Sequence, residues 1–255
     1  MSVRLQTLGG LRISRDGVEH HAFAAQKLRS ALLAYLAVER VVTRDAVISI
    51  FWADRDPERA RHALSQAIYE LRRALGAEFL DVTGDRLDAS AVEVDAHEFE
   101  RLVHDDLAEA ALVVYAGPFL DGFQIPGNRD FEQWVDQQRA RFARLHRRVR
   151  RASIEARAAA GDVAGALAGA RAWASIEPLE DEAHHRVIEF LAASGERTAA
   201  LQHFETYRRL VIEELEVEPL EQTQQLVARL REGETPDVGR LATLDRPRAH
   251  DTDPL

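Results

Sequence analysis

The side chains best suited to specific recognition lie on one face of a helix predicted over residues 57–75. At 100° per residue, an apolar stripe runs along this segment and must face a core: Ala60, Leu64, Ile68, Leu71 and Leu75. The opposite face is polar and has Glu70 as its one nearby acid. Its centre carries His62, Gln66, Tyr69 and Arg73, and its flanks carry Arg59, Ser65 and Arg72. Gln and Arg can pair with adenine and guanine edges in a DNA major groove, and Ser, Tyr and Arg suit phosphate oxygens.

The elements around this helix have the order strands, three helices, hairpin. Residues 3–8 and 11–13 alternate apolar and polar side chains around two glycines, which predicts short antiparallel strands. Helical spacing begins near Ala24, and Thr43 is the predicted N-cap of a second helix. Pro57 and Gly76 mark the start and the end of the third helix. Any exposed helix face is polar, but this position in the chain and the scarcity of acids favour contact with DNA.

Residues 79–89 predict a hairpin around Gly84 that could serve as a wing beside the third helix. Arg86 is the one side chain there that we expect to contact a phosphate or a groove. It lies among three acids, namely Asp81, Asp85 and Asp88.

Beyond residue 94 the pattern is helical, over about 95–104, 107–116, 129–160, 162–175, 179–194, 196–214 and 219–231. Gly161-Asp162 and Gly195-Glu196 each begin a helix pair, 34 residues apart, which is the period of a tetratricopeptide repeat. The sequence therefore predicts a mostly α chain with three parts. These are a winged-helix DNA-binding domain at 1–94, an all-α tetratricopeptide-like repeat domain at 95–232, and a disordered tail or linker at 233–255.

Composition excludes several classes of protein. The 255 residues are 46% hydrophobic and contain no cysteine, which rules out disulfides and thiolate metal sites. The net charge of −10 argues against indiscriminate coating of nucleic acid. The acids are concentrated in the second part, because residues 1–95 hold 13 Lys+Arg against 14 Asp+Glu whereas residues 96–232 hold 17 against 24. No apolar run approaches a membrane span and the N-terminus lacks an export signal, so we expect a soluble cytoplasmic protein.

Other constellations favour structural roles. Asp181-Glu182-Ala183-His184 spells a helicase-like box, but no phosphate-binding glycine loop accompanies it. His184 and His185 point about 100° apart on a helix and cannot share a metal as an i, i+4 pair could. We therefore expect no enzyme activity, no metal and no cofactor. The arginines of residues 139–151 either flank a core stripe as solvated side chains, which we favour, or form a second surface for DNA or an acidic partner.

An ordered series of motifs resembles the SARP-type bacterial activators. An OmpR-like winged helix is suggested by Thr43-Arg44-Asp45, Phe51-Trp52, Asp56–Leu64 and Tyr69–Gly76. The family's bacterial transcriptional activation domain is suggested by Val94-Asp95, Phe99-Glu100, Tyr115–Phe123, Phe131–Val135 and Glu213–Pro219. The resemblance implies an OmpR-like winged helix-turn-helix whose recognition helix is 57–75. It also implies that the preceding loop contacts RNA polymerase through Asp54, Arg55 and Asp56.

Our first hypothesis is a transcriptional activator that binds double-stranded promoter DNA as a homodimer on repeated half-sites. We expect it to recruit RNA polymerase and to associate with the nucleoid when bound to DNA. We expect no contact with a membrane. The alternative is a helical-repeat adaptor whose winged helix contacts protein, which the acidic wing supports. A third is the front part of a longer regulator, since the residues after Glu232 resemble a linker.

Overall fold

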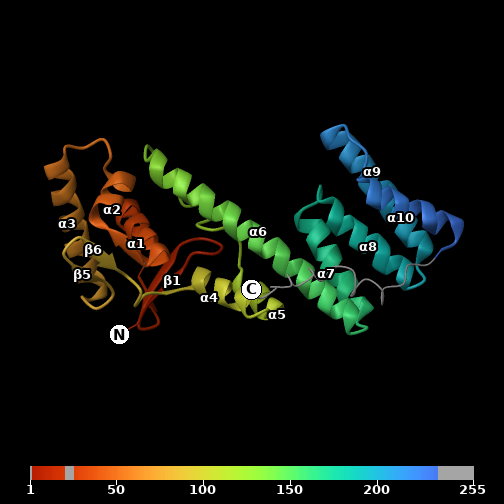
Figure 1. Cartoon of the computed structure of the whole chain (residues 1–255), viewed down its shortest axis with the longest axis horizontal. Coiled ribbons are helices and arrows are strands. Elements are labelled where there is room, and N and C mark those ends of the chain that lie inside the picture. Colours follow the sequence, from red (N-terminus) through yellow and green to blue (C-terminus); the bar gives the residue numbers. More distant parts are fainter. Residues whose placement is uncertain (1, 21–25, 235–255) are drawn as a thin grey trace, which may run out of the picture. The chain divides into compact units, whose positions relative to one another are not determined.

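A computed structural model of the chain describes residues 2–20 and 26–234 (Figure 1). Ala24, where helical spacing was predicted to begin, and residues 235–255 of the predicted tail lie outside the described residues. The chain divides into two compact units, Met1–Val149 and Arg150–Leu255. Each has its own hydrophobic core.

A four-stranded sheet opens the first unit, in the order β3 (Val18–Glu19), β2 (Arg12–Arg15), β1 (Val3–Gln6) and β7 (Glu93–Val94). β1 pairs antiparallel with β2, and Leu5 lies opposite Ile13. β1 also pairs parallel with β7, where Leu5 lies opposite Val94. Val3 and Leu5 are buried and Arg4 between them is exposed, so the alternation that predicted the first strands is confirmed.

Three helices follow, α1 (Lys27–Glu39), α2 (Arg44–Phe51) and α3 (Pro57–Leu75), and then the hairpin of β5 (Asp81–Thr83) and β6 (Arg86–Asp88). A further strand, β4 (Val41–Thr43), completes a sheet in the order β4, β6, β5. The predicted cap is confirmed, because the Thr43 hydroxyl accepts a hydrogen bond from Ala46 N at 3.2 Å. The hairpin turns at Gly84, where φ is +61°.

The first unit continues through α4 (Asp95–His104), α5 (Ala108–Val114) and the first part of α6 (Arg129–Ala159). Asp95 links α4 to β1: its carboxylate accepts hydrogen bonds from Thr7 N and Thr7 Oγ1, both at 2.7 Å, and from Leu8 N at 3.0 Å. The Trp134 indole donates to Glu39 at 2.7 Å. The domain boundary predicted at residue 94 lies within this compact unit, which continues to Val149.

Residues 116–120 lie against the end of β1. Leu8 forms an antiparallel bridge with Phe119, and Gly9 N donates to Pro118 O at 3.0 Å. Gly9 has a φ of +86°, and a Cβ there would lie 3.0 Å from the carbonyl carbon of Ala116. Glycine is thus required by both the backbone conformation and the close approach of the two segments.

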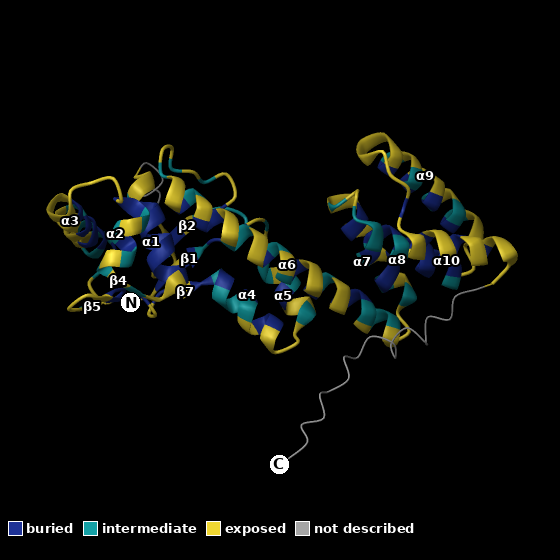
Figure 2. Cartoon of the chain, turned by 45° about the horizontal axis from the view of Figure 1, so that its top comes forward, coloured by how far each residue is buried: buried dark blue, intermediate teal, exposed yellow. Residues whose placement is uncertain are grey.

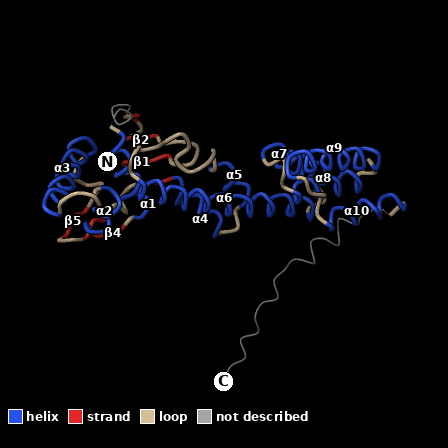
Figure 3. The backbone as a smooth tube through the Cα atoms, turned by 90° about the horizontal axis from the view of Figure 1, so that it is seen from above, coloured by secondary structure: helices blue, strands red, loops and turns tan. Residues whose placement is uncertain are grey.

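The second unit contains the end of α6 with α7 (Val163–Ile176), α8 (Asp181–Ala193), α9 (Arg197–Leu215) and α10 (Glu221–Glu232). Gly161 and Gly195, which are 34 residues apart, follow the ends of α6 and α8 with φ of +79° and +81°, the conformation in which glycine ends a helix. Successive helices turn buried faces toward one another and exposed faces outward (Figure 2). Short loops join them, as the tube in Figure 3 shows. The predicted mostly α fold, with a winged helix followed by repeat-like helices, is confirmed.

Within residues 2–20 and 26–234, the structure has no helix with both the length and the apolar character needed to cross a bilayer. The three tryptophans are core residues, because Trp52, Trp134 and Trp173 are all buried.

Candidate nucleic-acid interface

The orientation of α3 follows from its apolar stripe. All five side chains of the predicted stripe are buried, together with Ala67. The Asp56 side chain caps the helix by accepting hydrogen bonds from Glu58 N and Arg59 N, and Pro57 occupies the first turn. Because the buried stripe fixes the rotation of α3 about its axis, the opposite polar face is held toward solvent.

Six of the predicted contact residues lie on this outward face. We call them the reading face: Arg59, His62, Ser65, Gln66, Tyr69 and Arg73, all of which are exposed. Tyr69 is 60% exposed, an unusual position for a large aromatic side chain that has an apolar body and a polar tip. The face offers guanidinium, amide, imidazole and hydroxyl groups, which are the donors that base edges and phosphates accept.

Arg72 is placed differently from the other predicted contact residues. Its Nη2 donates a hydrogen bond to Leu80 O at 2.7 Å, and its side chain is half-buried. Leu80 directly precedes β5, so Arg72 ties the end of α3 to the hairpin. The structure therefore gives this guanidinium a positioning contact between two elements.

The second strand of the hairpin carries Arg86, whose side chain is exposed. Arg86 Nη2 donates to Asp88 Oδ2 at 2.7 Å, and its side chain remains 60% exposed. Hydrogen bonds from Ser90 and from Arg86 lower the pKa of Asp88 to about 2. Arg44 at the start of α2 anchors the turn, because its Nε donates to Gly84 O at 3.2 Å and its backbone N to Asp85 O at 2.9 Å. The Arg86 guanidinium thus uses Nη2 to bind Asp88, and its side chain remains largely exposed to solvent.

The loop between α2 and α3 presents the three residues that the resemblance assigned to RNA polymerase. Asp54, Arg55 and Asp56 are all exposed, and Arg55 N donates to Trp52 O at 3.1 Å. Since the Asp56 carboxylate caps α3, its role inside the chain is already structural. Asp54 and Arg55 are the more available side chains of this loop.

Most of the arginines of residues 139–151 are exposed, as expected for solvated side chains that flank a core stripe, but two are half-buried, Arg139 and Arg150. Arg139 donates to Phe119 O at 3.0 Å and to Leu120 O at 2.9 Å, and thereby holds the loop that contacts β1. The Arg150 side chain is only 12% exposed and pairs with Glu177 at 3.2 Å. Arg144 and Arg148 are exposed and line a cleft beside α4. Periodicity alone could not separate these cases, because it does not show which loop covers a helix.

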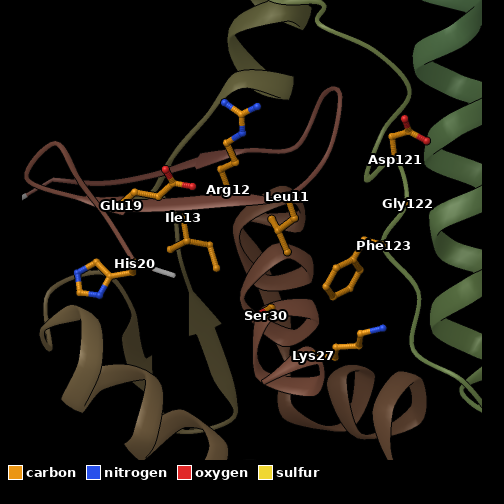
Figure 4. Close-up of a pocket in the computed structure, with 10 residues that line it drawn as sticks. All are labelled: Leu11, Arg12, Ile13, Glu19, His20, Lys27, Ser30, Asp121, Gly122 and Phe123. Carbon is orange, nitrogen blue, oxygen red and sulfur yellow. The ribbon is translucent and has the colours of Figure 1, made fainter. Parts of the chain in front are cut away.

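A separate cleft of about 260 Å³ lies in the first unit between β2, the start of α1 and residues 121–123. Leu11, Ile13 and Phe123 form its apolar side (Figure 4). Its other lining residues are Arg12, Glu19, His20, Lys27, Ser30, Asp121 and Gly122. Two cations are balanced by two carboxylates, so this cleft lacks the positive charge that a phosphate-binding surface requires.

One partner of the reading face was not found from the sequence. Glu70, which lies half-buried beside the reading face, faces Arg29 of α1 at 3.9 Å. The helical pattern identifies Glu70 as a nearby acid, but no local signal indicates that a residue of α1 approaches it.

Comparison with known proteins places the chain among bacterial regulators. Over 248 residues it is 27% identical to the regulatory protein AfsR of Streptomyces coelicolor, a match covering 90% of this chain and 24% of AfsR. AfsR of Streptomyces griseus is 26% identical, with the same coverage. The chain thus spans about a quarter of the length of these curated relatives.

A solved structure shares the fold. EmbR of Mycobacterium tuberculosis, solved in complex with a low-affinity phosphopeptide, superposes with a TM-score of 0.74 at 22% identity, covering 94% of this chain and 68% of EmbR. The model of the bacterial transcriptional activator domain matches residues 94–231. Because that match spans more than half of the residues, the chain belongs to the bacterial transcriptional activator domain family, a family of transcriptional regulators, and its predicted resemblance to SARP-type activators is confirmed.

Proposed function

We propose that this regulator is an activator that binds double-stranded promoter DNA sequence-specifically through α3. The observation that carries the proposal is the reading face, an exposed and acid-poor set of donors on a helix whose orientation is fixed by a buried stripe. The hairpin of β5 and β6 beside α3 supplies a wing. An α-helix of this kind fits the major groove, where each base pair presents its own pattern of donors and acceptors.

The proposal assigns a role to each predicted side chain. Gln66 and Arg73 read base edges, since amide and guanidinium groups can bond an edge twice. His62 and Tyr69 lie beside them, and the flanking Arg59 and Ser65 contact phosphates. Arg86 contacts the backbone from the wing, and Arg72 holds the wing against α3.

The loop before α3 is the proposed contact with RNA polymerase. Its support is the exposure of Asp54 and Arg55 at the entry to the recognition helix. We also propose a cytoplasmic homodimer on repeated half-sites. A chain of net charge −10 gains little from non-specific attraction to phosphates, so two linked sites supply the affinity that one does not.

Selection from a randomised duplex pool tests the proposal. The full chain is compared with a Gln66→Ala/Arg73→Ala variant, and the bound DNA is sequenced. We expect the wild type to enrich a repeated motif and the variant to lose it, because each bidentate base contact contributes about 1–3 kcal/mol. The matched control is Gln225→Ala/Arg229→Ala, which removes the same two side-chain types from the exposed face of α10.

If neither protein enriches a motif at low or moderate salt, the adaptor function becomes the better account. One feature of the second unit favours that alternative: Leu215, Val217 and Leu220 are each at least 50% exposed, between α9 and α10. Apolar side chains exposed together are typical of protein contact surfaces.

A further inference from the structure

Gln66, at the centre of the reading face, is held by a neighbour on the same helix. Its Nε2 donates a hydrogen bond to Glu70 Oε1 at 3.2 Å, one helical turn further on. Glu70 is in turn restrained from α1, because Arg29 Nη1 lies 3.9 Å from Glu70 Oε2. Arg29 is itself anchored, since the same Nη1 donates to Gln26 Oε1 at 2.6 Å. The start of α1, which packs against α3 (Figure 1), therefore supports a side chain on the DNA-facing surface.

The chemistry of this contact determines which way the Gln66 amide points. A carboxylate accepts hydrogen bonds and cannot donate them, so the amide nitrogen must face Glu70 and the amide oxygen must face away. The nitrogen carries two hydrogens, and Glu70 uses one of them. Gln66 therefore keeps one donor and one acceptor for another partner.

Adenine is the base whose major-groove edge complements that pair. It presents N7 as an acceptor and the N6 amino group as a donor, whereas guanine presents two acceptors there, thymine an acceptor and cytosine a donor. An amide that is free to rotate about its last torsion offers both polarities and must lose this freedom on binding. An amide that Glu70 already restrains has lost this rotational freedom before it meets the base.

We propose that Glu70, held by Arg29, is a positioning residue that fixes the polarity of the Gln66 amide and so makes Gln66 selective for adenine. This inference rests on the proposed function, because it names the base that one residue of the reading face selects. Glu70 contributes to this selectivity although its negative charge repels DNA phosphates. Its carboxylate therefore lowers overall affinity while it raises selectivity at one position.

The test repeats the duplex selection with the full-length Glu70→Gln variant, which keeps the size of the side chain and removes its charge. We expect one motif position to lose its adenine preference by about threefold to tenfold, since a glutamine at 70 accepts or donates and no longer fixes the polarity of Gln66. Overall affinity for DNA should stay equal or increase, because one negative charge is removed. Thermal unfolding of each variant checks that the fold is retained.

Two further variants separate positioning from a general effect. Glu58→Gln removes the other acid of α3 and should leave the adenine position unchanged. In a Gln66→Ala background, Glu70→Gln should no longer affect that position, because its effect passes through Gln66.

The inference is overturned if Glu70→Gln leaves every motif position unchanged, or if it changes the same position equally without Gln66. A wild-type protein that enriches no motif would overturn the proposed function and this inference together. A wild-type motif that is insensitive to Glu70→Gln would overturn this inference alone.

Discussion

At the scale of single residues, the histidines of the second unit form a network that depends on their neutral state. His184 Nε2 lies 3.0 Å from Pro178 O, which can only accept, so this nitrogen carries the proton. His184 Nδ1 then accepts from His203 Nε2 at 2.9 Å, and the His184 ring stacks on Tyr207. Burial, together with the neighbouring His184 and Arg171, lowers the pKa of His203 to about 4. Burial also lowers the pKa of His184. Protonation of both His184 and His203 would set two N–H groups against each other.

This network predicts that acid destabilises the second unit. The ordinary pKa of histidine, 6.5, exceeds the folded value for His203, so the unfolded chain binds a proton first as pH falls. Stability present above pH 6.5 is therefore lost progressively toward pH 4. We expect His203→Gln, which can still donate to His184 but does not titrate, to show a smaller fall in thermal midpoint between these pH values. Circular dichroism melts of the full chain measure it.

The control for this prediction is His104→Gln, which changes an exposed histidine of α4 in the first unit. Parallel pH profiles for the wild type and His203→Gln would contradict the role given to the network.

At the scale of elements, Asp95 joins the start of α4 to the end of β1. Asp95→Ala would leave the backbone N–H groups of Thr7 and Leu8, both in fully buried residues, without their acceptor. Each buried donor left unpaired costs about 1–3 kcal/mol, so we expect a loss on the order of 3 kcal/mol or more in the free energy of unfolding. Urea denaturation of the full chain measures this loss of unfolding free energy in the first unit.

An exposed acid at the opposite end of α4 provides the comparison. Asp105→Ala breaks an exposed i, i+4 pair with Arg101 and should change stability by less than about 1 kcal/mol. If Asp95→Ala is no more destabilising than Asp105→Ala, the link between β1 and α4 is not what holds these elements together.

At the scale of the whole molecule, the proposed binding of DNA by an acidic chain requires a local set of cations. The net charge of −10 opposes approach to phosphates, so affinity depends on the few arginines at the interface. We expect binding to the selected motif to weaken with salt, with a log–log slope of about −0.9 for each phosphate contacted. Arg59→Ala should weaken binding uniformly across sequences and reduce the magnitude of that slope by about one.

Fluorescence anisotropy of labelled duplex over a range of salt concentrations checks this prediction, with Arg229→Ala on α10 as the matched change in charge. Salt-independent binding, or an unchanged slope for Arg59→Ala, would show that the contact is not with the phosphate backbone.

The sequence by itself determined the helices, the first strands, the hairpin and the outward face of α3, whereas the short strands β4 and β7 were not predicted. Thr43, Pro57 and Gly76 act on backbone groups within a few residues, so caps and helix ends are visible locally. The helical period likewise predicted the buried stripe of α3. A 34-residue repeat revealed the paired helices between Gly161 and Glu232, because each pair repeats a local pattern.

The tertiary structure alone decided which distant segments meet. The parallel pairing of β1 with β7 and the hydrogen bonds between Thr7 and Asp95, 88 residues apart, join segments whose sequences carry no signal for each other. For the same reason, the sequence marked Glu70 only as an acid near the reading face, while the fold brought Arg29 beside it. Periodicity reports which side of an element is buried, but not which partner covers it, since that choice is made by packing across the whole unit.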